Sequence, residues 1–128
     1  MSRPALLLID IQNDYFPGGN WEVHEMEAAA IQAADALKAA RAAGAPVIHI
    51  RHEASNPAVP FFQIDATTRV AADLGHHVTV LHDACAAKAQ SFGSTDVPAP
   101  MVHAAIMAAL GGTYAEVLTS HEVISRYL

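Results

Sequence analysis

Cysteine is almost absent from this 128-residue chain, which has a single one, Cys85. One cysteine excludes an internal disulfide and is typical of a protein in the reducing cytoplasm. The longest apolar runs fall far short of the ~20 residues that a membrane span needs. Residues 1–9 also lack the apolar segment and the small-residue cleavage site of a signal peptide. We therefore expect a cytoplasmic protein with no membrane partner.

Basic residues are scarce as well. The chain has seven Lys and Arg and thirteen Asp and Glu, which gives a net charge of −6 at pH 7, and no run of basic residues occurs. A nucleic-acid binder needs a clustered basic face, so we expect no nucleic-acid partner. The glycine-rich GxGxxG and GK[ST] patterns that hold nucleotide phosphates are missing too. We therefore predict no cofactor.

Apolar residues are abundant, and they alternate between strand-like and helix-like patterns. Hydrophobic residues make up 52% of the chain and charged residues 16%, values typical of a globular protein, and the length fits one domain over residues 1–128. Apolar and β-branched runs predict strands over 5–11, 46–51, 77–83 and 115–119. Apolar residues at three-to-four spacing predict helices over 25–43, 65–74 and 100–110. This alternation predicts a Rossmann-like α/β fold, with helices on both faces of a parallel sheet of about four strands.

Several polar residues follow the predicted strands. Asp10, His52 and Asp83 each come at a carboxyl end, where open parallel sheets bind their ligands. Asp10 ends the stretch LLLID, and two interpretations of it stay open: a general base at the strand tip, or a carboxylate that caps the following loop. Asp14 begins the turn DYFPGG, so we interpret it as a capping residue.

Other side chains near this edge could serve a site. Phe16 and Trp21 could form the walls of a pocket for a flat substrate, although such aromatics more often belong to the core. The eight histidines do not predict a metal site, since His49 and His52, an odd number of residues apart, would point to opposite faces of a strand. We therefore predict no bound metal. Cys85 has Lys88 three residues on, but its apolar surroundings in DACAA favour a structural thiol.

Long stretches of the sequence resemble the isochorismatase-like cysteine hydrolase family. They include ALLLIDIQNDYFPGG, APVIHIRHEAS, DATTRVAADLGHHVTVLHDACAAK and YAEVLTSHEVI, and they keep the family's order along nearly the whole chain. The resemblance implies a three-layer α/β/α fold and hydrolysis of a small amide, imide or enol ether. It also implies a small-molecule substrate, a catalytic Asp–Lys–Cys triad and assembly into homo-oligomers.

Only one triad residue has a counterpart here. Asp10 matches the family's aspartate at the end of the first strand. The cysteine would precede the helix that starts at 64–65, where Phe61, Phe62 and Gln63 stand instead. The lysine is missing too, since Lys38 lies within a predicted helix and Lys88 follows the third predicted strand.

These departures indicate an internal shortening between Gln63 and Ile64. Relative to the family pattern, the chain omits a strand–helix–strand unit, which takes roughly thirty residues or more. If the gap closes, residues 77–83 should pair directly with 5–11, and the strand order should be 2-1-3-4 in chain order.

Three functions remain open at this point. The first is a hydrolase of the family, impaired by the absent cysteine and lysine. The second is a shortened relative with no catalysis, which keeps a binding or structural role. The third is a metal-assisted hydrolase that uses Asp10 and histidines, which the opposed strand positions of those histidines disfavour.

Overall fold

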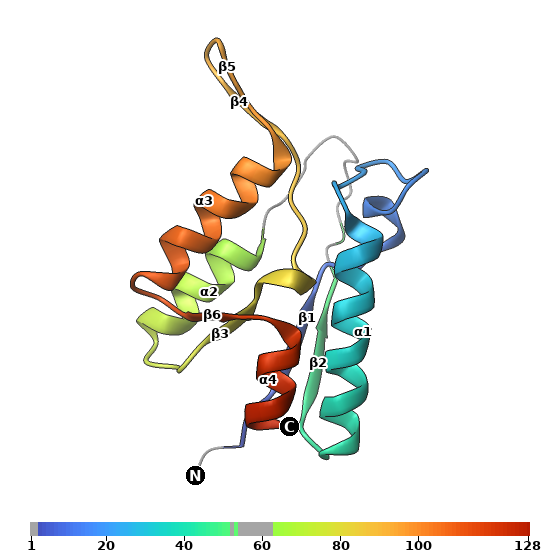
Figure 1. Ribbon diagram of the computed structural model, residues 1–128, viewed down its shortest axis with the longest axis vertical. Coiled ribbons are helices and arrows are strands. Elements are labelled where there is room, and N and C mark those ends of the chain that lie inside the picture. The colour runs from blue at the N-terminus through green and yellow to red at the C-terminus, as the bar shows by residue number, and fades with distance from the viewer. Residues whose placement is uncertain (1–2, 52, 54–62) are drawn as a thin grey trace.

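A computed structural model describes residues 3–51, 53 and 63–128 of the chain. The predicted fold class is confirmed: the chain is an α/β protein with parallel strands and flanking helices (Figure 1). The strands are β1 (Leu6–Ile9), β2 (Val47–Ile50), β3 (Thr79–Leu81), β4 (Gln90–Phe92), β5 (Thr95–Val97) and β6 (Glu116–Leu118). The helices are α1 (Met26–Ala42), α2 (Gln63–Asp73), α3 (Ala99–Gly111) and α4 (Ser120–Tyr127), and short 3₁₀ turns form η1 (Asn13–Tyr15) and η2 (His82–Ala84).

The four predicted parallel strands are present, but their order differs from the expectation. β1 pairs in parallel with β2, and β3 pairs in parallel with β6. Within the described ranges these two pairs form separate sheets, and β3 does not pair with β1. The predicted order 2-1-3-4 is therefore wrong. Contacts of η2 and α4 with α1 set the position of the β3–β6 pair, and they leave β1 and β3 without a shared ladder.

The helices pack in two groups. α1 contacts both β1 and β2 and also α4, whereas α2 contacts α3, which packs against β6 (Figure 1). The helix predicted over 25–43 ends as expected: Gly44 has a φ of +64°, and its N–H donates to the carbonyl of Arg41. A left-handed residue at this position ends a helix, and glycine adopts it without steric cost.

Small side chains dominate the core. α1 buries four alanines, Ala29, Ala33, Ala36 and Ala40. In the described part of the chain, Leu110 is the only large side chain with less than 2% of its surface exposed. Since buried apolar area provides the main driving force for folding, alanines contribute little and the core is thin.

Two elements differ from the sequence expectations. The stretch SFGSTDVPAP, where the sequence predicts neither a helix nor a strand, contributes to the β4–β5 hairpin, with Phe92 opposite Thr95. The last residues form α4, which no periodic pattern had indicated. Its start is a capping box, in which Thr119 Oγ1 accepts a hydrogen bond from the Glu122 N–H, and the Glu122 carboxylate accepts one from the Thr119 N–H. Residues 53–63, where the sequence also predicts neither a helix nor a strand, lie almost wholly outside the described residues.

We predict that Thr119→Ala lowers the free energy of unfolding by about 1 kcal/mol, because the substitution removes the side chain that caps α4. Urea denaturation followed by circular dichroism measures this loss. Ser125→Ala is the matched control on the exposed side of the same helix, and it should be neutral or slightly stabilising. Equal effects of the two substitutions would show that the cap contributes nothing.

Among the described residues, no helix has the length and apolar character to cross a bilayer.

Candidate functional site

Asp10 lies at the carboxyl end of β1, where the sequence places it. Its N–H donates to the Ile50 carbonyl at 2.9 Å, which continues the β1–β2 ladder by one residue. Its φ of 55° is in the left-handed region, which aspartate tolerates better than most residues. The Asp10 side chain is half-buried and lies near Tyr15. Burial of the Tyr15 hydroxyl is the largest cause that raises its pKa, and the charges of Asp10 and Asp14 raise it further. Its role as a proton acceptor stays a prediction.

Hydrogen bonds to Asp14 hold the loop after η1, whereas the predicted capping role of Asp14 stays a prediction. The Asp14 carbonyl accepts from the Trp21 N–H at 2.8 Å, and its carboxylate accepts from the Asn20 side-chain amide at 3.0 Å. Gly19 packs so tightly here that a Cβ atom would lie 2.4 Å from the Asp14 carbonyl oxygen. Only glycine fits at this position, so the loop conformation depends on it.

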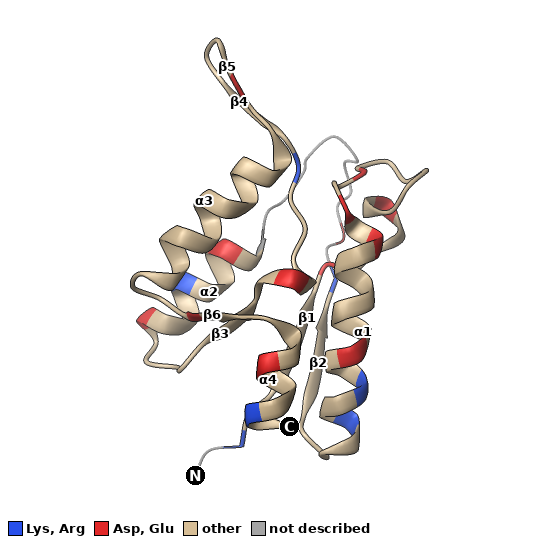
Figure 2. Ribbon diagram, in the orientation of Figure 1, with Lys and Arg blue, Asp and Glu red and all other residues tan. Residues whose placement is uncertain are grey.

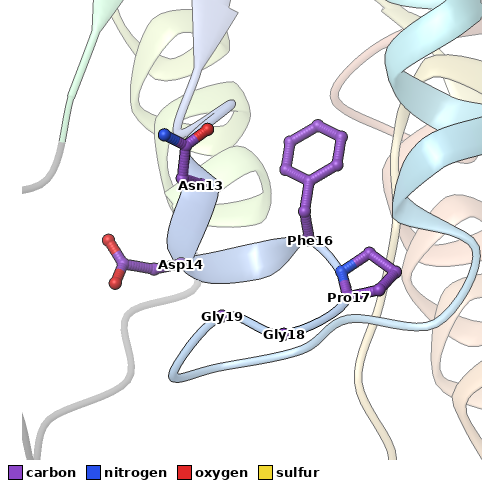
Figure 3. A pocket seen from close by; sticks show the side chains of 6 residues that line it. All are labelled: Asn13, Asp14, Phe16, Pro17, Gly18 and Gly19. Atoms are coloured by element: carbon purple, nitrogen blue, oxygen red, sulfur yellow. The ribbon is translucent and has the colours of Figure 1, made fainter.

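Phe16 lines a hollow of about 380 Å³ formed by its own loop (Figure 3). Figure 3 shows the Asp14 side chain projecting away from Phe16 and Pro17, so these groups do not converge on a common point. Trp21 is not among the residues that line this hollow. Its ring lies under the ammonium group of Lys88, 5.7 Å from the ring centroid, in a cation–π contact. The substrate-binding roles of Phe16 and Trp21 stay predictions.

The thiol of Cys85 is held in a neutral state. It follows η2, and Sγ donates a hydrogen bond to the Leu81 carbonyl at 3.2 Å. Burial, and to a lesser extent the charge of Asp83, raises the pKa of this thiol from its ordinary value of 9.0 to about 12. Because a thiolate is the nucleophilic form, Cys85 is unsuited to attack a substrate near neutral pH.

A second hollow of about 380 Å³ lies between η2 and the first turns of α1 and α3. Three histidines line it, His24, His82 and His103, together with Cys85. The Nε2 atom of His103 lies 2.9 Å from the His82 carbonyl oxygen, so His103 is packed and hydrogen-bonded. Over residues 3–51, 53 and 63–128 no three His, Cys, Asp or Glu side chains are arranged to hold a metal ion. His52 lies outside the described residues.

One polar network was not expected from the sequence. The Asp83 carboxylate accepts hydrogen bonds from both the N–H and the hydroxyl of Ser120, each at 2.8 Å. The Ser120 hydroxyl oxygen also lies 2.6 Å from Oε1 of Gln32. A hydroxyl has a single proton, so it serves one of these acceptors at a time. The network joins η2, α4 and α1, and it gives Asp83 a structural partner instead of an open position at the strand end.

The charged side chains form no broad basic face. Figure 2 shows Lys and Arg few and spread over several elements, with Asp and Glu more numerous over the part of the chain that it colours. Arg69, for example, is paired with Asp65 at 2.8 Å along α2. The site at the strand ends is therefore defined by Asp10 and the adjacent loop, and not by a cationic patch.

Comparison with known proteins gives consistent results. The sequence profile of the isochorismatase domain matches residues 4–65. An isochorismatase family protein of Bacillus subtilis, YddQ, is 32% identical over 172 residues, with 91% of this chain and 96% of the relative covered. A crystal structure from Oleispira antarctica, assigned to the isochorismatase hydrolases, has a TM-score of 0.85 and 34% identity, and covers 94% of this chain and 95% of its own. A cysteine hydrolase from Pseudomonas syringae pv. phaseolicola has a TM-score of 0.81 at 20% identity, with 99% and 98% covered, and shows likeness of fold alone.

Proposed function

Because this chain belongs to the isochorismatase family, we propose that it keeps the family fold but lacks cysteine-dependent hydrolysis of small amides, imides or enol ethers. The observation that carries this proposal is the state of its one thiol. Cys85 is partly buried, donates to the Leu81 carbonyl and has a pKa raised to about 12. We also propose that the chain is cytoplasmic, in keeping with its single cysteine.

Covalent hydrolysis by cysteine requires a thiolate that can reach the substrate carbon. A helix N-terminus favours the thiolate, because its backbone N–H groups and dipole stabilise negative charge. The helix that would provide this environment is α2, which begins at Gln63. Its first turn contains Asp65, whose carboxylate is paired with Arg69. Cys85 belongs to a different segment, directly after η2.

Three observations support the loss of a strand–helix–strand unit between Gln63 and Ile64. The alignment with the Bacillus relative runs over 172 residues, more than the 128 of this chain, so the relative contains residues with no counterpart here. The match to the family profile ends at residue 65, beside the proposed junction. Within the described part, β1 and β3 belong to separate sheets, which fits a gap that a missing strand has left open, although we had expected this gap to close.

Asp10 has a definite place in this proposal. It keeps the position of a proton acceptor at the end of β1, although the groups that would share its chemistry are missing. The chain would then have a non-catalytic binding or structural role, with the loop beside Asp10 as the remaining recognition element. An alternative, hydrolysis that uses Cys85 as a displaced nucleophile, predicts that alkylation abolishes turnover.

The test first screens small amides and enol ethers for compounds that the Bacillus relative hydrolyses, and it then offers these compounds to this chain. We expect purified wild-type chain to show no hydrolysis above that of Cys85→Ala, before or after iodoacetamide. Turnover that is lost both on alkylation and in Cys85→Ala would overturn the proposal. As a matched control, the relative's intervening segment is inserted between Gln63 and Ile64. This chimera should gain turnover, and Asp10→Asn in the chimera should remove it.

A further inference from the structure

Strand β1 has one open edge. Within the described residues it pairs only with β2, in parallel. The Asp10 N–H donates to the Ile50 carbonyl on the β2 side. Because main-chain groups of successive strand residues point to alternate edges, those of Leu7 and Ile9 point to the edge away from β2. An open edge of this kind is a template for pairing with a further strand.

Strand β3 has an open edge as well. Among the described residues it pairs only with β6, where the Glu116 N–H donates to the Val78 carbonyl, so the main-chain groups of Thr79 point away from β6. Helix α1 packs on β1 and β2 and also contacts η2, which directly follows β3. The likeness to the Oleispira structure covers 94% of this chain, so the two strand pairs keep the relative placement that they have there. If a strand between β1 and β3 has been lost, as proposed above, these two open edges border the place that it occupied.

The β1–β2 pair also has an uncovered apolar face. Leu7 of β1 and Ile48 of β2 are register partners, and they are 43% and 49% exposed. Leu8, the next residue, is buried, and α1 is the helix that packs on both strands. Because alternate residues of a strand point to opposite faces, Leu7 and Ile48 lie on the face away from α1. In parallel sheets, helices normally cover both faces.

The strands that the structure describes are all in use. β1 pairs with β2, β3 with β6, and β4 with β5, so none of them is left over to enter the gap between β1 and β3. The Bacillus relative aligns over 172 residues, more than the 128 of this chain, so it contains a segment that this chain does not have. The occupant of the gap therefore has to come from a different polypeptide.

We propose that a second, different polypeptide inserts one parallel strand into the gap between β1 and β3 and packs an adjoining amphipathic helix on Leu7 and Ile48. The inference rests on the proposed loss of the strand–helix–strand unit, and it names the partner for the binding role of this chain. The inserted strand is covered on both faces, so it is a continuous run of apolar, β-branched residues. The helix has an apolar stripe on the side that meets the sheet. Because this chain has a net charge of −6, the partner is basic outside these apolar surfaces.

A binding experiment tests the helix contact. The probe is the segment of the Bacillus relative that lies opposite the junction of Gln63 and Ile64, fused to a soluble carrier protein. Calorimetry should show that it binds the full chain one to one. Leu7→Asp and Ile48→Asp should each keep the wild-type circular dichroism spectrum and weaken binding roughly tenfold or more, because they place a charge beneath the helix. Ile31→Asp is the matched control at a residue of α1 that is 61% exposed, and it should bind as the wild type does.

Two results of this experiment would overturn the proposal. The first is that the wild-type chain does not bind the probe. The second is that all three aspartate variants weaken binding equally, since the contact would then not involve the β1–β2 face.

Hydrogen exchange followed by NMR tests whether a strand enters the gap. When the probe binds, the amide protons of Leu7, Ile9 and Thr79 should exchange roughly a hundredfold more slowly, because they become hydrogen-bonded to the inserted strand. The amide proton of Gly93, in the β4–β5 turn, is the internal control and should not change. A probe with proline at two alternate positions of its strand lacks the ladder donors, and it should produce no slowing. Tight binding by the unaltered probe without slowing would show that no strand is inserted, and it would overturn the proposal.

The outcomes separate this inference from the proposed function. If the single-chain chimera gains turnover while the separate segment does not bind, the inference is wrong and the proposed function stands. If the segment binds and slows exchange while the chimera stays inactive, the inference stands and the proposed function is wrong. Slow exchange of the Leu7 and Ile9 amides in the chain alone, increasing with its concentration, would show that a second copy occupies the gap, and it would overturn the inference.

Discussion

Replacing Leu110 by alanine should lower the free energy of unfolding by roughly 3–5 kcal/mol. Leu110 lies near the end of α3 with none of its surface exposed. Removing its side chain loses the transfer free energy of the buried methyl groups and leaves a cavity among its neighbours. The loss is large for this chain in particular, because about half of the other buried residues of the described core are alanines. A small domain has only about 5–15 kcal/mol of stability in total, so the substitution should remove a large share of it.

Urea denaturation of wild type and Leu110→Ala measures this loss. Leu74→Ala is the matched control, because it removes the same atoms from a side chain that is 72% exposed. The control should change the unfolding free energy by less than about 0.5 kcal/mol. If Leu110→Ala cost less than about 1 kcal/mol, the surroundings of α3 would have to collapse around the missing side chain, and the thin core would be more adaptable than its packing indicates.

The local structure of this chain could largely be predicted from the sequence. The four parallel strands and the three predicted helices are all present, because apolar periodicity and glycine stops such as Gly44 act within short segments. The β4–β5 hairpin was missed because its three-residue strands lie within a stretch rich in Gly, Ser and Pro. The last helix was missed because its 8 residues are too few to show an apolar period. Its start is marked only by the capping box of Thr119 and Glu122.

The arrangement of the strands could not be predicted in the same way. The expectation that β3 pairs with β1 assumed that a gap in a sheet closes. In the structure, β3 pairs with β6 and is held in place by the contacts of η2 and α4 with α1. These contacts join residues far apart in the chain, and closing the gap would require breaking them. No pattern in the sequence indicates whether β3 pairs with β1 or whether the contacts of η2 and α4 with α1 prevail.

The sequence predicts where the candidate site lies, but it does not predict the hydrogen bonds and burial that decide the chemistry of its residues. Asp10 could be placed at a strand end because an apolar run led directly to it. The network of Asp83 with Ser120 and Gln32 could not, because its members are separated by 37 and 88 residues. Sequence spacing also could not reveal that Cys85 is partly buried and hydrogen-bonded to a carbonyl, which decides whether it could act as a nucleophile.

Burial of the Cys85 thiol has a consequence for stability at alkaline pH. The pKa of the thiol is raised from 9.0 to about 12 in the folded chain, while an unfolded thiol keeps its ordinary value. Below about pH 8.5 both states are protonated, and the thiol adds no pH dependence. Between pH 9 and 12 the unfolded chain loses this proton and the folded chain keeps it. Stability therefore falls as the pH rises, by about 1.4 kcal/mol for each pH unit in that window.

Wild type should accordingly lose about 2 kcal/mol more stability than Cys85→Ala between pH 8.5 and 10.5, because alanine has no proton to release. Urea denaturation at each pH measures the difference, and tyrosine and lysine titration cancels between the two chains. The same shift should make iodoacetamide modify native Cys85 at pH 8 roughly a thousandfold more slowly than in the urea-unfolded chain, since the thiolate fraction falls tenfold per unit of pKa. Parallel pH profiles for the two chains, together with fast labelling of the native thiol, would show that Cys85 is reached by solvent and ionises freely.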